Sequence, residues 1–155
     1  KDITNHKKVE EYLVKVLKKQ ANDRSGLVYG MGHAIYTKSD PRTVVLKKHA
    51  ASLAEKKGFK SEFDLLQKIE TLSPKVFHDT TGKEKVICAN VDMYSGLIYR
   101  MLGIPSELYT PLFATARVAG WCAHRLEEIM VSDKIIRPAY KNVYKGKEYT
   151  SIKDR

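Results

Sequence analysis

The chain has 155 residues, 43% of them hydrophobic and 30% charged. This composition supplies a hydrophobic core and excludes a disordered or collagen-like chain, and the length predicts one domain or a domain with a tail. Apolar runs never approach the roughly 20 residues that a membrane-spanning helix needs. The first residues carry no signal-peptide pattern. We therefore expect no membrane partner and a cytoplasmic location.

Basic residues outnumber acidic ones, with 28 Lys and Arg against 18 Asp and Glu, a formal charge of +10. Such a charge is typical of proteins with a polyanionic partner, but also of a lysine-rich solvated surface. The lysines lie within stretches of helical spacing, and no zinc-finger or RNA-binding motif accompanies them. We favour the solvated surface and expect no nucleic-acid partner. A phosphate-bearing small ligand is the third interpretation.

The two cysteines, Cys88 and Cys122, lie far apart, and neither belongs to a CxxC pair. Zinc and iron–sulfur sites usually need such clusters. We therefore expect no metal, and two buried free thiols in a reducing compartment.

Apolar residues recur at helical spacing along most of the chain. The spacing predicts helices over residues 9–17, 41–57, 65–76, 94–102 and 107–131. Asp40 and Pro41 form a favourable N-cap and first-turn pair, and Gly58 is a typical stop. Residues 78–85 are polar and predict a loop. No alternating pattern predicts a strand, so we expect an all-α chain with a boundary between two packing units at residues 103–105.

The glycine-rich segment 26–42 places Gly30, Gly32 and His33 in one loop before a helix. Glycines let a backbone approach a ligand closely, and histidine donates or exchanges a proton near neutral pH. Arg42 follows in the first turn of the helix, where a guanidinium can bind a carboxylate through two hydrogen bonds. Composition alone equally allows a loop histidine without a function.

Three further residues have a functional and a structural interpretation. Asp92 stands at the start of an apolar helix, either as an N-cap or as a carboxylate base whose pKa partial burial raises. Arg117 lies in an otherwise apolar stretch, where a charge needs an anionic partner or a short route to water. Arg137 precedes Pro138 as a further candidate for contact with an anion.

Together these segments resemble citrate synthase. Residues 30–42, GMGHAIYTKSDPR, match the family's glycine–histidine and D-P-R signature, and residues 90–96, NVDMYSG, match its N-V-D-x-x-S-G segment. Residues 112–128 match its arginine-bearing helix, and residues 135–140, IIRPAY, match its C-terminal R-P element. Four segments in the family's order, spread over about residues 7–145, make the resemblance specific.

The resemblance implies an all-α fold, a homodimer, and condensation of acetyl-CoA with oxaloacetate and water to citrate and CoA. This is an acyltransferase reaction of the tricarboxylic acid cycle and implies no further cofactor. Residues 1–103 would be the small domain, which closes over the substrates. Residues 104–155 would be the C-terminal segment of the large domain.

The resemblance also implies a role for each matching residue. Asp92 would remove a proton from the acetyl methyl group, and His33 would hydrogen-bond the ketone of oxaloacetate. Arg42 and Arg117 would hold the carboxylates of oxaloacetate, and Arg137 would reach the neighbouring subunit's site. The CoA side would be lined by Gly30, Met31, Gly32 and Asn90, largely through backbone atoms.

Two departures from the family pattern concern the CoA side. Met31 stands where the family has an aromatic residue, and Thr37 stands where some members have an arginine for the CoA phosphate. Lys38, the neighbour of Thr37, is then the expected phosphate contact.

The family's upstream half carries a histidine that donates to the thioester oxygen and a second histidine that binds oxaloacetate, and neither has a match in this chain. We therefore interpret the chain as a C-terminal fragment that is inactive alone. Two alternatives stay open. One is 2-methylcitrate synthase, which would use the same residues on propionyl-CoA. The other is a non-enzymatic helical module for binding or dimerisation.

Overall fold

The structure, a computed structural model, describes residues 5–131, 151 and 153. The chain divides into two compact units, Lys1–Phe113 and Ala114–Arg155, which are taken in turn. The helices are α1 (His6–Leu17), α2 (Pro41–Lys57), α3 (Lys60–Thr81), α4 (Asp92–Met101), the short 3₁₀ helix η1 (Ser106–Leu108) and α5 (Tyr109–Val131). Within the described residues the only β-type pairing is one isolated bridge, so the expected all-α class is confirmed.

Helix α2 begins and ends at the predicted residues. The Asp40 side chain accepts a hydrogen bond from the backbone N–H of Arg42 over 3.0 Å, as an N-cap does, and Pro41 fills the first helical position. At the other end Gly58 has a φ of +76° and donates its N–H to the carbonyl of Ala54. Both ends were predictable because each depends on two or three adjacent residues.

Helix α3 is longer than its apolar pattern predicts. It starts at Lys60 and runs to Thr81, so the predicted loop over residues 78–85 is wrong for its first four residues. Gly82 marks the end, with a φ of +65° and its N–H donated to the carbonyl of His78. The last turn is polar because it faces solvent, and a pattern of buried residues cannot detect such a turn.

Two hydrophobic clusters hold helices α1–α4 together. In the first, α2 packs on α4 with Phe63 of α3, and Tyr94 at its centre is fully buried. Lys47 of α2 and the Tyr94 hydroxyl both donate to Glu70 of α3, over 2.6 and 2.5 Å. The second cluster joins α1 to α3 through Val9, Leu13, Leu72 and Val76. Each such apolar side chain contributes about 1.5–3 kcal/mol when fully buried.

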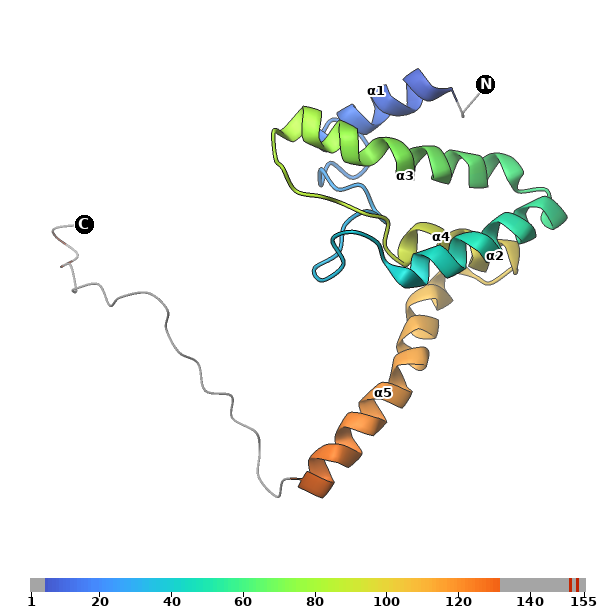
Figure 1. Cartoon of the computed structure of the whole chain (residues 1–155), viewed down its shortest axis with the longest axis vertical. Coiled ribbons are helices and arrows are strands. Elements are labelled where there is room, and N and C mark those ends of the chain that lie inside the picture. Colours follow the sequence, from blue (N-terminus) through green and yellow to red (C-terminus); the bar gives the residue numbers. More distant parts are fainter. Residues whose placement is uncertain (1–4, 132–150, 152, 154–155) are drawn as a thin grey trace. The chain divides into compact units, whose positions relative to one another are not determined.

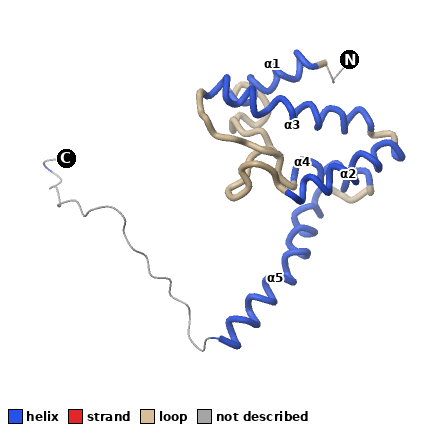
Figure 2. Tube along the Cα trace, in the orientation of Figure 1, coloured by secondary structure: helices blue, strands red, loops and turns tan. Residues whose placement is uncertain are grey.

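Figure 1 shows the resulting arrangement, with α1 along α3 and α2 against α4. The connections 18–40 and 82–91 are loops, drawn in tan in Figure 2, and they run side by side. Since residues 32 and 90 come from these two loops, the packing of the helices sets the distance between the two segments that carry the predicted site.

Helix α5 covers most of the predicted segment 107–131, and its residues from Ala114 onward belong to the second unit. Arg125 donates to Glu128 over 2.7 Å, as expected for an ordinary helical pair. Large exposed apolar side chains on this part of the helix are Val118, Trp121, Leu126, Ile129, Met130 and Val131. An apolar surface of this kind favours association with another protein surface.

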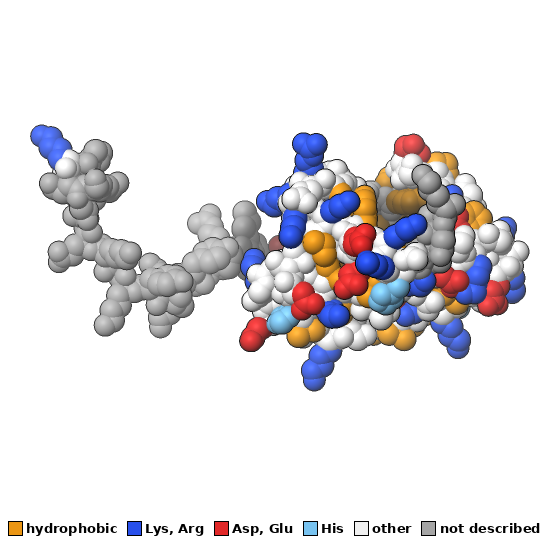
Figure 3. Space-filling model, turned by 90° about the horizontal axis from the view of Figure 1, so that it is seen from above, with side chains coloured by type: hydrophobic (Ala, Val, Ile, Leu, Met, Phe, Trp, Pro, Cys, Tyr) orange, Lys and Arg blue, Asp and Glu red, His pale blue; other side chains and the backbone are white. Residues whose placement is uncertain are grey.

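Surface features bear on three composition-based expectations. Cys88 is half-buried and Cys122 is exposed, so the expectation of two buried thiols is wrong. Lys and Arg are interspersed with Asp and Glu on the face drawn in Figure 3, which fits a solvated charged surface there. Among the described helices, none combines the length and hydropathy of a membrane span.

Candidate active site

The site begins with the pairing of the two loops. Gly32 donates its N–H to the carbonyl of Cys88 over 2.7 Å, and Asn90 donates its N–H to the carbonyl of Gly30 over 2.8 Å. Met31 and Ala89 form the antiparallel bridge between these bonds. The pairing fixes the glycine loop against the segment that leads into α4.

Gly30 and Gly32 are required by backbone conformation, since their φ angles are +83° and +89°. Residues other than glycine rarely adopt such angles. At Gly30 a Cβ would also lie 2.9 Å from the Cα of Met93, which is backbone that cannot move aside easily. At Gly32 the nearest atom would be 4.0 Å away. The loop can therefore lie directly on the first turn of α4 only where residue 30 has no side chain.

Asn90 joins the two loops to the start of α4 through its side chain. Its Nδ2 donates to the carbonyl of Gly32 over 2.8 Å, and its Oδ1 accepts the backbone N–H of Asp92 over 2.9 Å. Asp92 is the first residue of α4, and no side-chain hydrogen bond caps that helix at the preceding residue, Val91. The N-cap interpretation of Asp92 is therefore wrong. Asp92 is exposed, so the partial burial expected for it is not found.

The imidazole of His33 is held by the backbone of residues that follow it in the loop. Its Nδ1 accepts hydrogen bonds from the N–H groups of Ile35 and Tyr36, over 3.0 and 3.2 Å. A ring nitrogen that accepts must be unprotonated, so the neutral ring carries its proton on Nε2. His33 is half-buried. The geometry therefore leaves Nε2–H as the donor of this side chain toward a ligand.

Arg42 is oriented by the buried carboxylate of Asp40. Its Nε donates to Asp40 Oδ1 over 3.0 Å and its Nη2 donates to Asp40 Oδ2 over 2.8 Å. These hydrogen bonds lower the pKa of Asp40 although burial of the carboxyl acts against them, and they raise the pKa of Arg42. These two hydrogen bonds hold Arg42 as a charged donor in one orientation and leave its Nη1 available to a ligand.

Tyr36 lies between the two predicted ligand contacts. Its ring centroid is 4.7 Å from that of His33, and the guanidinium carbon of Arg42 lies 5.5 Å from the same ring centroid. The carbonyl of Tyr36 accepts a hydrogen bond from the thiol of Cys88 over 3.3 Å. Tyr36 thus connects the histidine, the arginine and the second loop.

Electrostatic contacts place Asp92 and His33 within range of the Arg42–Asp40 pair. The hydrogen bonds that Arg42 donates to Asp40 are the main cause of the raised pKa of Arg42, and smaller contributions come from Asp40, Tyr36 and Asp92 as charges. His33 likewise contributes to the lowered pKa of Asp40, as the smallest of several causes that are led by Arg42. His33, Arg42 and Asp92 all lie in the first unit, and their roles at a site stay a prediction.

A cavity of about 270 Å³ adjoins Asp92, whereas His33 and Arg42 are not among its lining residues. Four residues predicted for the CoA side line it, namely Gly30, Met31, Gly32 and Asn90, and Asp92 lines it as well. Lys85 is the lysine of its lining, whereas Lys38 lines a different cavity. The expected contact of Lys38 with the CoA phosphate stays a prediction.

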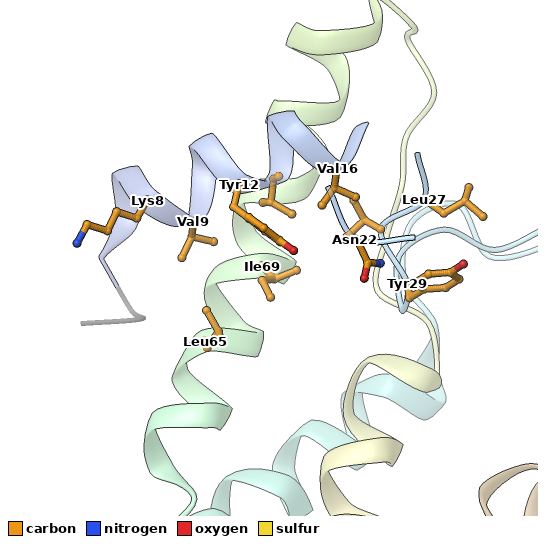
Figure 4. A pocket seen from close by; sticks show the side chains of 11 residues that line it. Lys8, Val9, Tyr12, Val16, Asn22, Leu27, Tyr29, Leu65 and Ile69 are labelled. Carbon is orange, nitrogen blue, oxygen red and sulfur yellow. The ribbon is translucent and has the colours of Figure 1, made fainter. Parts of the chain in front are cut away.

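A larger apolar cavity of about 610 Å³ lies between α1, α3 and the segment before the glycine loop. In Figure 4, side chains of Tyr12 and Val16 from α1 and Ile69 from α3 point into it. Its lining shares Leu27, Val28 and Tyr29 with the smaller cavity. The Tyr29 hydroxyl donates to Asp23 Oδ2 over 2.5 Å, which fixes the outer end of this shared wall.

Two predicted arginines lie outside this group. Arg117 is exposed on α5 in the second unit. Arg137 lies outside the described residues.

Sequence reasoning also missed three residues of the site. Asp40 was identified only as a cap, although its distance of two residues from Arg42 permits an ion pair. One sequence feature could have identified Tyr36, namely that it is an aromatic residue between His33 and Arg42. No sequence feature identifies Lys85, because only the fold brings it to the cavity.

The fold and the site define an all-helical domain that presents a histidine, an arginine and a carboxylate from two paired loops and the adjacent helix starts. The chain belongs to the citrate synthase family, since residues 1–139 match the description "Citrate synthase, C-terminal domain".

Relatives in sequence are citrate synthases. The chain is 45% identical to that of Synechocystis sp. over 111 residues, which cover 72% of this chain and 26% of the relative. It is 39% identical to that of Deinococcus radiodurans over 134 residues, covering 86% of this chain and 34% of the relative. The chain thus spans about a third or less of the length of these two relatives.

Solved structures give the same result. Citrate synthase from Pyrobaculum aerophilum matches 99% of this chain and 36% of its own, with a TM-score of 0.69 and 29% identity. Citrate synthase from Thermoplasma acidophilum, in a ternary complex with carboxymethyl coenzyme A and oxaloacetate, matches 99% of this chain and 42% of its own. The TM-score is 0.63 and the identity 29%.

Proposed function

We propose that this chain supplies the base, the ketone donor and a carboxylate-binding arginine of a citrate synthase, which condenses acetyl-CoA with oxaloacetate and water to citrate and CoA. The observation that carries the proposal is the Asn90 side chain, which bonds the backbone carbonyl of Gly32 and the backbone N–H of Asp92 and so ties the histidine loop to the start of α4. The Thermoplasma relative, in complex with a CoA derivative and oxaloacetate, supports the choice of ligands.

The first step is removal of a proton from the acetyl methyl group by the Asp92 carboxylate. The resulting carbanion forms a carbon–carbon bond with the ketone carbon of oxaloacetate, and the ketone oxygen takes the electron pair. His33 donates from Nε2–H to that oxygen, which lowers the energy of the developing negative charge. Because Nδ1 is held by two backbone donors, the ring cannot rotate away from the ketone without losing both bonds.

Arg42 binds a carboxylate of oxaloacetate in this proposal. Its guanidinium is already oriented by Asp40, so little side-chain entropy is lost when the substrate binds. Arg117 and Arg137 are the further expected carboxylate contacts. Water then cleaves the thioester of the condensed product, releasing citrate and CoA.

The CoA side of the proposal uses the cavity lined by Gly30, Met31, Gly32 and Asn90. Backbone atoms of the glycine loop would approach CoA closely, and Lys85 takes the place of Lys38 as the cation for its phosphates. We propose that the chain alone is inactive, and that the whole protein acts in the cytoplasm as a homodimer. The exposed apolar side chains of α5 support an association of this kind.

A chimera tests the proposal. The matching C-terminal part of the Deinococcus relative is replaced by this chain, and CoA release from acetyl-CoA and oxaloacetate is measured. We expect activity in the chimera and a loss of several orders of magnitude in kcat with Asp92→Asn. Asp79→Asn, at an exposed position that lines neither of the two cavities described above, is the matched control and should keep most of the rate. A chimera that folds, retains Asp92 and binds neither substrate would contradict the proposal.

The acyl group is decided by a second measurement on the same chimera. Acetyl-CoA and propionyl-CoA differ by one methylene, which is worth about 1–3 kcal/mol in a transition state. We expect the larger kcat/KM for acetyl-CoA. A preference for propionyl-CoA would assign the 2-methylcitrate reaction to the same residues.

A further inference from the structure

A cavity of about 450 Å³ opens beside the first turn of α2 and has no part in the proposed reaction. The polar residues of its lining include Lys38, Ser39, Thr43 and Lys47. Its apolar residues include Val44, Pro74 and Ile87. A lining that combines cationic and apolar side chains fits an organic anion better than a bare inorganic ion.

Thr43 gives the clearest sign of a missing ligand. Its side chain lines the cavity, the residue is 3% exposed, and its Oγ1 has no hydrogen-bond partner within the described part of the chain. A buried hydroxyl without a partner destabilises a fold, and natural proteins satisfy most such groups. An oxygen of a bound ligand would accept the hydrogen bond of this hydroxyl.

The charges around Thr43 select an anion. Lys47 is paired with Glu70, which also accepts from Tyr94, so that carboxylate is already satisfied at one oxygen. Lys38 is exposed and makes no ion pair with the described residues. Thr43 lies in the first turn of α2, whose N-terminal end adds a partial positive charge. The two lysines outnumber the one carboxylate of the lining.

We propose that this cavity binds a small phosphate monoester, with its phosphate at Lys38, Thr43 and Lys47 and its organic part against the apolar residues of the lining. The site is separate from the CoA cavity, with which it shares only Met31 and Ile87 among its lining residues. Binding here therefore does not depend on the proposed reaction.

The test is an NMR titration of the ¹⁵N-labelled 155-residue chain with phenyl phosphate at constant ionic strength. We expect saturable shifts at the amides of Ser39, Thr43 and Lys47, and at least threefold weaker binding of inorganic phosphate, which lacks the apolar part. Thr43→Val keeps the shape and removes the hydroxyl. It should weaken binding about tenfold or more and at the same time raise the melting temperature, which a purely structural threonine would not do.

Lys38→Gln should weaken phenyl phosphate binding by a similar factor, whereas Lys48→Gln is the control. Lys48 is exposed on the same helix and does not line the cavity, so the control loses the same charge elsewhere. Equal losses of affinity in the two lysine variants would show that only the overall charge matters, and would overturn the proposed site. An unchanged affinity in Thr43→Val or a titration without saturation would overturn it as well. Full displacement of phenyl phosphate by CoA would also overturn it, because the cavity would then be part of the CoA site.

Discussion

The side chain of Asn90 bonds Gly32 through its nitrogen and Asp92 through its oxygen, over 2.8 and 2.9 Å. Gly32 precedes the histidine of the site, and Asp92 carries its carboxylate. One amide thus links the backbone next to His33 with the backbone of Asp92. Both polar atoms of the Asn90 side chain are engaged within the chain, so we predict that this side chain positions the two residues, while the expected contact of Asn90 with CoA stays a prediction.

Asn90→Asp tests this positioning. Aspartate keeps an acceptor for the N–H of Asp92 but cannot donate to the carbonyl of Gly32, so a carboxylate oxygen would face that carbonyl. We expect the free energy of unfolding to fall by about 1–2 kcal/mol, measured by urea denaturation. In the chimera we expect kcat to fall more than KM rises. Asn22→Asp, an exposed position, is the control with the same change of charge. Equal losses in both variants would contradict the positioning role.

Gly30→Ala and Gly32→Ala form a matched pair. Both residues have positive φ, so both variants carry a backbone penalty of about 1 kcal/mol or more. Only at residue 30 would the new Cβ lie 2.9 Å from backbone, at Met93. We expect Gly30→Ala to lower the free energy of unfolding by at least about 1 kcal/mol more than Gly32→Ala. Equal penalties from urea denaturation would show that the loop does not lie on α4 in this way.

The lowered pKa of Asp40 predicts how the free energy of unfolding changes at low pH. Its hydrogen bonds from Arg42 lower its pKa below the ordinary value of 3.8. A carboxyl with a depressed pKa binds fewer protons when folded than when unfolded. Its contribution is therefore fully present above about pH 4 and is lost as the pH falls through the lower, folded value.

Asp40→Asn should remove this dependence and flatten the fall in unfolding free energy below about pH 4. It should also cost about 1.5–3 kcal/mol at pH 7, where a hydrogen-bonded charge pair is lost. Asp64→Asn is the control, because Asp64 pairs with Lys60 at the surface and such pairs contribute about 0–1 kcal/mol. Chemical denaturation between pH 2 and 7 measures the free energy of unfolding of both variants. If the free energy of unfolding of Asp40→Asn fell below pH 4 as steeply as that of the unchanged chain, Asp40 would not be the cause of this fall.

Local signals in the sequence predict the elements that depend on a few neighbouring residues. Asp40, Pro41 and Gly58 bound α2 correctly, and the helical spacing identifies the all-α class. The motif around His33 and Arg42 is likewise contiguous, so the resemblance could place both residues in one loop and the following turn.

Features that depend on residues far apart in the chain could not be predicted in this way. Lys38 is adjacent to Thr37 in the sequence, and its contact with the CoA phosphate stays a prediction; its side chain lines a different cavity from the one that we propose for CoA. Lys85 reaches the proposed CoA cavity from the loop after α3, 53 residues beyond Gly32. The exposure of Asp92 also depends on packing, because a helix start with an apolar face can turn its first carboxylate toward the core or toward solvent.

The tautomer of His33 can be measured in the chain itself. Two backbone N–H groups donate to Nδ1, so that nitrogen must be unprotonated and the proton of the neutral ring must lie on Nε2. At a pH where the ring is neutral, the ¹⁵N shifts of the labelled imidazole should show Nδ1 without a proton and Nε2 with one. His49, which is exposed and has no hydrogen-bond partner among the described residues, is the internal reference and should show a mixture of tautomers. A proton on Nδ1 of His33 would remove its bonds to Ile35 and Tyr36 and, with them, the orientation on which the proposed donation from Nε2–H to the ketone depends.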